Sequence, residues 1–272
     1  MTDDFLFSCI FGLAWLLILP TLLIAVGSWV VSLLVKNSFR THAAFGLLGV
    51  PVHELSHALF CLVFRMPITK IKLYSPNLKT GILGYVAFAY NPSSLGHAVG
   101  LLFQGVAPLI VCCLILNLLI PLPEQGFTYL DVKGEWFLSA LTEGVNNALG
   151  LTVGNIASGW EGATWACLAL LIAAYAIPSW TDVRVALRGA VVVALMFIAA
   201  CAFLTVAGEI TPEAFRGDVI AYLELVQSSI MAGLYSLISS VSQVAAVSLI
   251  GIVCIQITPA VAGLLIKKVF RH

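Results

Sequence analysis

The chain has 272 residues, of which 61% are hydrophobic and only 10% are charged. Soluble domains carry about 25% charged residues, so this composition excludes an ordinary soluble protein and predicts an integral membrane protein in a lipid bilayer. Thirteen lysines and arginines balance thirteen acids, which gives a net charge of zero. The chain therefore lacks the basic surface with which nucleic-acid-binding proteins contact phosphates, and no nucleic acid partner is expected.

The N-terminal residues do not form the basic region of a signal peptide. Asp3 and Asp4 stand where such a leader carries lysine or arginine, and the apolar run that follows is too long for one. The seven cysteines all lie in apolar runs without a CxxC pair, a pattern typical of small buried or lipid-facing residues. We therefore expect neither a cleaved leader nor disulfides.

Apolar segments long enough to cross a bilayer as helices, about 20 residues each, recur along the whole chain. They predict one all-α polytopic membrane domain over residues 1–272 with about six transmembrane helices. The segments lie at about 5–35, 43–64, 97–121, 163–179, 189–207 and 229–266. The first and last exceed one span and contain Pro20 and Pro259, so each can be tilted or kinked.

The distribution of lysine and arginine predicts the orientation, because these residues collect in cytoplasmic loops. A cytoplasmic N-terminus places nine of the thirteen cations inside: Arg65, Lys70, Lys72, Lys79, Arg184, Arg188, Lys267, Lys268 and Arg271. Lys36 and Arg40, in the first outer loop, do not fit this pattern. A compact chain without an organelle-targeting sequence favours a prokaryotic plasma (inner) membrane.

A segment of different character, Ile68–Asn91, separates the second and third spans. It is rich in β-forming residues (ITKIKLY, then ILGYVAFAY) on either side of turn-forming residues that include Pro76 and Gly81. The pattern predicts a small β-hairpin at about 68–91, with an ordinary cytoplasmic loop as the alternative. An exposed strand edge there could pair with an extended peptide.

The second span contains a HExxH motif, His53-Glu54-Leu55-Ser56-His57. On a helix, His53 and His57 lie one turn apart on the same face, so both imidazoles can bind one metal ion. Glu54 lies beside them and is free to act as a base on water at the metal. A charged residue near the bilayer centre costs about 2.5–3.5 kcal/mol, so three ionisable groups within five residues indicate a functional site.

Two structural interpretations compete with this one. The histidines could be hydrogen-bonded core residues, or they could belong to a structural metal site. A structural site would normally be completed by further Cys or His ligands, and neither is obviously supplied in this sequence.

A catalytic zinc site needs a third protein ligand and leaves one position for water. Asp182 lies at the cytoplasmic end of the fourth predicted span, which runs in the same direction as the HExxH span, so its depth matches. Alternatively, Asp182 could be a solvated loop residue paired with Arg184 and Arg188. The other candidates are Glu143, in the long outer loop, and His42 and His97, neither of which has a partner at ligand spacing.

The membrane-embedded HExxH, the hairpin, Gly105-Val106-Ala107-Pro108 in the third span and the Pro-containing turn before an Asp together resemble the site-2 protease family of intramembrane zinc metalloproteases. The resemblance covers about residues 43–190. It implies that His53, His57 and Asp182 bind one Zn²⁺ ion and that Glu54 is the catalytic acid/base. The substrates would be single-pass membrane proteins, cleaved in or near their transmembrane segments on the cytoplasmic side.

The chain also departs from the family's pattern. Asp182 is followed by Val183 where the family usually has Gly, and the Asn usually found upstream has no counterpart in Ala173-Ala174-Tyr175. The group that stabilises the oxyanion therefore stays unidentified. Segments of about 40 residues at most between the spans leave no room for an inserted PDZ domain.

Other function classes use metals in membranes. A non-proteolytic transporter or sensor could use the same ligands, although transporters often show two related halves and this chain shows no repeat. Di-iron hydroxylases and desaturases need more than the five histidines present. An inactive scaffold would not need Glu54. His/His/carboxylate ligand sets also suit divalent ions other than zinc, and the sequence does not determine the substrate or the oligomeric state.

Overall fold

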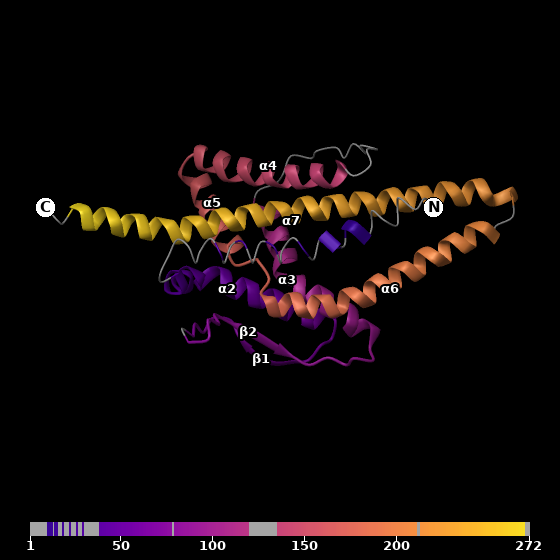
Figure 1. The fold of residues 1–272 in the computed structure, drawn as a ribbon, viewed down its shortest axis with the longest axis horizontal. Coiled ribbons are helices and arrows are strands. Elements are labelled where there is room, and N and C mark those ends of the chain that lie inside the picture. Colours follow the sequence, from indigo (N-terminus) through magenta and orange to yellow (C-terminus); the bar gives the residue numbers. More distant parts are fainter. Residues whose placement is uncertain are drawn as a thin grey trace.

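The computed structural model describes residues 38–77, 79–119, 135–210 and 213–269, together with isolated positions between residues 10 and 29. The predicted first span, 5–35, lies mostly outside these residues. Within the described ranges the chain is mostly helical (Figure 1). The elements in chain order are α2 (Ser38–Val63), β1 (Ile68–Lys72), β2 (Tyr85–Phe88), α3 (Leu95–Leu119), α4 (Glu135–Ala157), α5 (Trp160–Ala173), α6 (Trp180–Ile210) and α7 (Glu213–Val269).

Four helices in the described ranges are long and apolar enough to cross a membrane, which supports an integral membrane protein. The candidate spans are Arg40–Val63, Leu95–Leu116, Trp180–Ala200 and Ser228–Ile255. Helices suit a bilayer because all their backbone hydrogen bonds are made within one segment. The predicted count of about six spans is not confirmed.

The predicted span 163–179 differs from the structure. The helix there, α5, has 14 residues and ends at Ala173, and a turn over 174–179 follows it. Pro178 has no N–H to continue a helix and disfavours helical geometry in the residue before it. The next helix starts at Trp180, not at about 189, so Asp182 lies in the first turn of α6 and not at the end of α5.

The region read as a long outer loop contains α4. Its sequence mixes Thr, Asn and Glu with apolar residues, which hides a helical pattern when only hydropathy is considered. In the structure α4 packs along α7 (Figure 1). The two helices approach closely at Gly144, where an added Cβ would overlap the backbone oxygen of Ser239 on α7.

The predicted hairpin is confirmed. β1 and β2 are antiparallel, with Ile68 opposite Phe88 and Lys72 opposite Tyr85. The turn is held by an Asn77–Ile82 bridge, and Gly81 adopts a φ of 73°, which favours glycine. Figure 1 shows the hairpin on the side of α2 that faces away from α7.

One buried cluster lies where α3, α4, α5 and α7 meet. Small residues let these helices approach closely, as is common between membrane helices. Gly105 allows the same kind of approach between α3 and α6, since a Cβ there would overlap the backbone oxygen of Asp182. This contact presses the first turn of α6 against α3, next to the HExxH segment of α2.

Candidate metal centre

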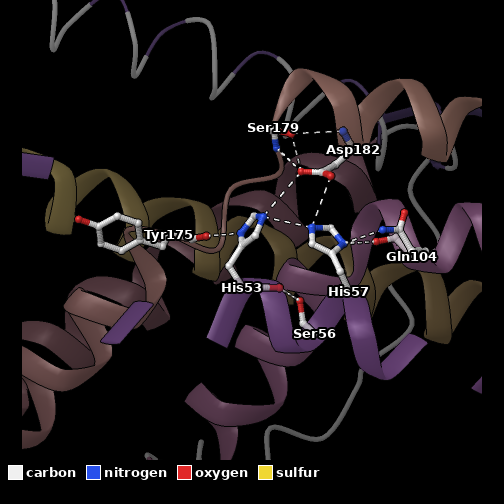
Figure 2. A network of polar contacts seen from close by, with 7 residues as sticks. All are labelled: His53, Ser56, His57, Gln104, Tyr175, Ser179 and Asp182. Atoms are coloured by element: carbon white, nitrogen blue, oxygen red, sulfur yellow. Dashed lines mark hydrogen bonds and ion pairs between the residues drawn. The ribbon is translucent and has the colours of Figure 1, made fainter. Parts of the chain in front are cut away.

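Helix α2 presents the two histidines of the HExxH motif side by side. The Nε2 atoms of His53 and His57 are 3.1 Å apart, and the ring planes are nearly perpendicular (Figure 2). The four-residue spacing of the motif places both rings on one face of the helix, as the sequence predicts. His57 is buried and His53 is half-buried.

Asp182 reaches the same point from α6. Its Oδ1 lies 3.4 Å from the Nε2 of His57, and its Oδ2 lies 3.7 Å from the Nε2 of His53. One ligand atom from each of the three residues lies within 4.8 Å of the other two, and Figure 2 shows the three side chains converging. In the described part of the chain, no other group of three or more potential ligands has such an arrangement.

Hydrogen bonds on the far side of each ring determine which histidine nitrogens carry protons. The Nδ1 of His53 lies 2.6 Å from the backbone oxygen of Tyr175, and the Nδ1 of His57 lies 2.7 Å from that of Gln104. A carbonyl can only accept, so each Nδ1 is protonated and donates. Each Nε2 then directs a lone pair towards the point where the three side chains meet.

Two lone pairs and a carboxylate that face one another repel unless a cation lies between them. A tetrahedral Zn²⁺ with Zn–N bonds of about 2.0–2.1 Å separates its ligand atoms by about 3.3–3.4 Å. The separations are 3.1 Å between the two Nε2 atoms, 3.4 Å from Oδ1 of Asp182 to His57 and 3.7 Å from its Oδ2 to His53, all near that value. The residues therefore fit a divalent metal ion, and a carbonyl bonded to each Nδ1–H is the usual outer partner of a metal-binding histidine.

Tyr175 holds its carbonyl in place through its own side chain. The phenol donates to the backbone oxygen of His42, and its ring stacks on the His42 imidazole at 4.5 Å. Gly46 and Gly49 make room for that ring, since a Cβ at Gly49 would overlap it. Burial raises the pKa of the Tyr175 phenol, so it stays a neutral donor. Sequence reasoning did not single out Tyr175; the Gly46–Gly49 spacing on α2 was the available signal.

Gln104 on α3 supports His57 in the same way, and sequence reasoning also missed it. Besides its backbone oxygen, its side-chain amide lies 3.2 Å from the Nδ1 of His57. The atom at that distance is the amide Nε2, and the buried Oε1 has no partner among the described residues. Because Nδ1 carries a proton, the flipped amide, with Oε1 towards His57, satisfies both groups. Gln104 is buried, so the amide contributes to a closed polar environment behind His57.

Asp182 is held by the turn that precedes it. The backbone N–H and the hydroxyl of Ser179 both lie 2.7 Å from its Oδ2 (Figure 2). In return the Asp182 N–H donates to the Ser179 hydroxyl oxygen at 3.3 Å. This reciprocal pair is a capping box at the start of α6.

Glu54 lies next to the three ligands but is not one of them. It is buried, and its carboxylate interacts electrostatically with both His53 and Asp182. The hairpin covers it: a Cβ at Gly84 would lie 2.8 Å from the Glu54 Cγ. The site therefore joins three helices and the residue before β2.

The structure does not bring the other candidate ligands to this point. Glu143, on α4, accepts a 2.5 Å hydrogen bond from the Tyr235 hydroxyl of α7. His42 stacks on Tyr175, and the Nδ1 of His97 accepts from the Asn91 N–H at 2.8 Å. Asp182 faces the histidines, and among the described residues no ion pair links it to Arg184 or Arg188.

Comparison of the chain with protein-family models, with curated proteins and with solved structures finds no match.

Proposed function

We propose that the protein is an intramembrane zinc metalloprotease, similar to the site-2 protease family, that hydrolyses peptide bonds in or near the transmembrane segments of single-pass membrane proteins. The active site would face the cytoplasmic side of a prokaryotic plasma membrane. One observation carries the proposal: the Nε2 atoms of His53 and His57 and the Asp182 carboxylate converge in an apolar helical protein, with the buried Glu54 beside them.

His53, His57 and Asp182 would hold the Zn²⁺ ion. When bound, the ion supplies a Lewis acid that polarises a carbonyl and lowers the pKa of water towards 7. Three protein ligands leave the remaining position open, as catalytic zinc sites require.

Glu54 would move the proton. Its carboxylate accepts a proton from the attacking water while the new C–O bond forms, and it then delivers that proton to the amine nitrogen as the C–N bond breaks. A glutamate that is buried next to the ligands, and hydrogen-bonded to none of them, suits both steps. The products are a carboxylate and an amine, so the reaction needs only water.

The hairpin offers a place for the substrate. Peptide bonds in a helix are hidden in i→i−4 hydrogen bonds, so a transmembrane substrate must unwind before attack. Unsatisfied backbone groups in lipid cost several kcal/mol each. A strand edge of the β1–β2 sheet can satisfy them by pairing with the unwound segment. Gly84, the residue before β2, lies so close to Glu54 that a Cβ there would overlap its side chain, which supports this role.

A glutamine substitution tests the proposal. Glu54→Gln keeps the size of the side chain but removes the base, so the purified variant should retain zinc and lose cleavage of a reconstituted single-pass substrate, by 100-fold or more, on the order of a lost general acid/base. Glu143→Gln is the matched control, because Glu143 lies on α4 with Tyr235, outside the metal centre. It should cleave at the wild-type rate, and undiminished cleavage by Glu54→Gln would contradict the proposal.

The alternative is a metal-binding transporter or sensor without proteolysis. It would use the same three ligands, but it assigns no proton transfer to Glu54. The transporter is favoured if neither the wild type nor Glu54→Gln cleaves the substrate, while zinc crosses proteoliposome membranes that contain the wild type.

A further inference from the structure

The two oxygens of the Asp182 carboxylate have different surroundings. Oδ2 accepts two hydrogen bonds of 2.7 Å from Ser179, one from its N–H and one from its hydroxyl. A carboxylate oxygen has about two lone-pair sites, so both sites on Oδ2 are used. Oδ2 is also 3.7 Å from the Nε2 of His53, whereas Oδ1 accepts neither Ser179 bond and lies nearer to a ligand nitrogen, 3.4 Å from the Nε2 of His57.

The same contacts fix the carboxylate to the start of α6. The Asp182 N–H donates to the Ser179 hydroxyl oxygen, so the side chains and backbones of the two residues are linked in both directions. The turn over 174–179 thus supplies two constraints, because it also contains the Tyr175 carbonyl that orients His53. A small rotation of Asp182 would break at least one of the Ser179 bonds.

We propose that Ser179 is a positioning residue of the metal centre, which makes Asp182 a ligand through Oδ1 alone. With Oδ2 occupied, Asp182 contributes one ligand atom, and the coordination position that a second oxygen would fill stays open for water. This inference rests on the metal-binding part of the proposed function and not on proteolysis.

The expected effect of losing Ser179 follows from this role. Without its hydroxyl, Oδ2 keeps only the backbone N–H and has a free lone pair, so the carboxylate can turn and bind through both oxygens. Loss of an outer hydrogen-bond partner of a metal ligand typically lowers metal affinity by about 10–100-fold. The change therefore affects both affinity and coordination number.

Two measurements on the purified full-length protein follow these effects. Zn²⁺ affinity is measured at fixed pH by competition with a chromophoric chelator, and coordination number from the visible absorption of the Co²⁺-loaded protein, which is intense for four-coordinate and weaker for five-coordinate cobalt. Ser179→Ala should bind Zn²⁺ about 10–100-fold more weakly and give the weaker cobalt bands. Ser179→Thr, which keeps the hydroxyl, should match the wild type.

The chain provides a matched control. Ser94 caps α3 in the same way, accepting from the His97 N–H at 3.3 Å, but it contacts none of the three ligands. Ser94→Ala should leave Zn²⁺ affinity and the cobalt spectrum unchanged. If Ser179→Ala does not fold, Ser179→Gly serves instead, because glycine at a helix N-cap costs only a few tenths of a kcal/mol. It should show the same loss as Ser179→Ala.

The possible outcomes separate the inference from the function. Wild-type affinity and spectrum in Ser179→Ala or Ser179→Gly, or an equal loss in Ser94→Ala, would overturn the positioning role alone. A wild-type protein that binds neither Zn²⁺ nor Co²⁺ would overturn both proposals. Full cleavage by Glu54→Gln, together with the expected loss of Zn²⁺ affinity in Ser179→Ala, would overturn only the proposal of proteolysis.

Discussion

Each histidine of the HExxH motif is fixed by a backbone carbonyl from another part of the chain. Tyr175 provides one carbonyl from the turn after α5, and Gln104 provides the other from α3. In the neutral rings, these carbonyls keep both Nδ1 atoms protonated, so that the Nε2 lone pairs face each other and Asp182 and can bind a metal ion. The tautomer that metal binding needs is therefore favoured by backbone groups of the fold.

Removal of the Tyr175 hydroxyl tests whether its bond to His42 helps to hold the carbonyl that orients His53. Tyr175→Phe removes the bond to the His42 oxygen but keeps the stacked ring, so the turn and its carbonyl should loosen. We expect the metal-free protein to lose about 0.5–1.5 kcal/mol of stability, measured by unfolding in detergent, and Zn²⁺ affinity to fall several-fold.

Tyr74→Phe is the control for this change. Tyr74 also donates to a backbone oxygen on α2, that of Ala43, at 2.5 Å, but it has no hydrogen bond to a metal ligand. It should lower stability by a similar amount and leave Zn²⁺ affinity unchanged. If both variants lose affinity equally, the effect of Tyr175 is general destabilisation and not control of His53.

Among the elements that carry the ligands, α2 is predicted well from the sequence and the start of α6 is not. The geometry of His53 and His57 depends on spacing within one helix, which a sequence shows directly. Asp182 was selected as the third ligand by matching depth, and the structure does bring it to the histidines. The helix that carries it was nevertheless assigned wrongly, because hydropathy stays high through the turn at 174–179. Pro178 and the Ser179 cap were the signals that mark the break.

The side chains that support the ligands could not be predicted in this way. Tyr175 and Gln104 act through their backbone oxygens, and every residue offers such an oxygen whatever its side chain. Only the packing of α3 and α5 against α2 determines which carbonyls reach the rings. Gly49 permits the close approach of α5 and its following turn to α2, but a glycine in an apolar helix does not reveal its partner.

The hairpin contacts α2 where Gly84 lies against Glu54, and a substitution at Gly84 tests this contact. In Gly84→Ala the new Cβ would lie 2.8 Å from the Glu54 Cγ and 2.9 Å from the backbone oxygens of Lys72 and Leu73, so either the hairpin or Glu54 must move. Displacement of a catalytic group by about 1 Å can cost about 100-fold in rate. We expect kcat for cleavage to fall by roughly 10–100-fold, with zinc content unchanged.

Gly96→Ala is the control for Gly84→Ala. Gly96 lies in the first turn of α3, and its nearest neighbour to a new Cβ is the Ser94 hydroxyl at 3.8 Å. This variant should cleave normally. Loss of zinc from Gly84→Ala, or normal cleavage by it, would show that the hairpin does not fix Glu54 in the position inferred from the structure.

At the scale of the whole molecule, three segments must assemble before a metal site exists: α2, α3, and the continuous stretch that runs from the turn at 174–179 into α6. The ligands come from α2 and α6, and the oxygens that orient the histidines come from α3 and from the turn after α5. The candidate spans include α2, α3 and α6, so the site lies among apolar helices. Desolvated imidazoles and carboxylates are costly there unless they are paired or bind a cation. The central claim is that a single divalent cation meets this requirement.

Elemental analysis of the purified protein tests that claim most directly, after loading with Zn²⁺ and removal of the excess. We predict about one zinc per chain for the wild type and for Glu143→Ala, and a large loss for His57→Ala and Asp182→Ala, because these remove a ligand from the only three-residue group found in the described ranges. A wild-type protein without zinc, or a His57→Ala variant with the full amount, would contradict the account.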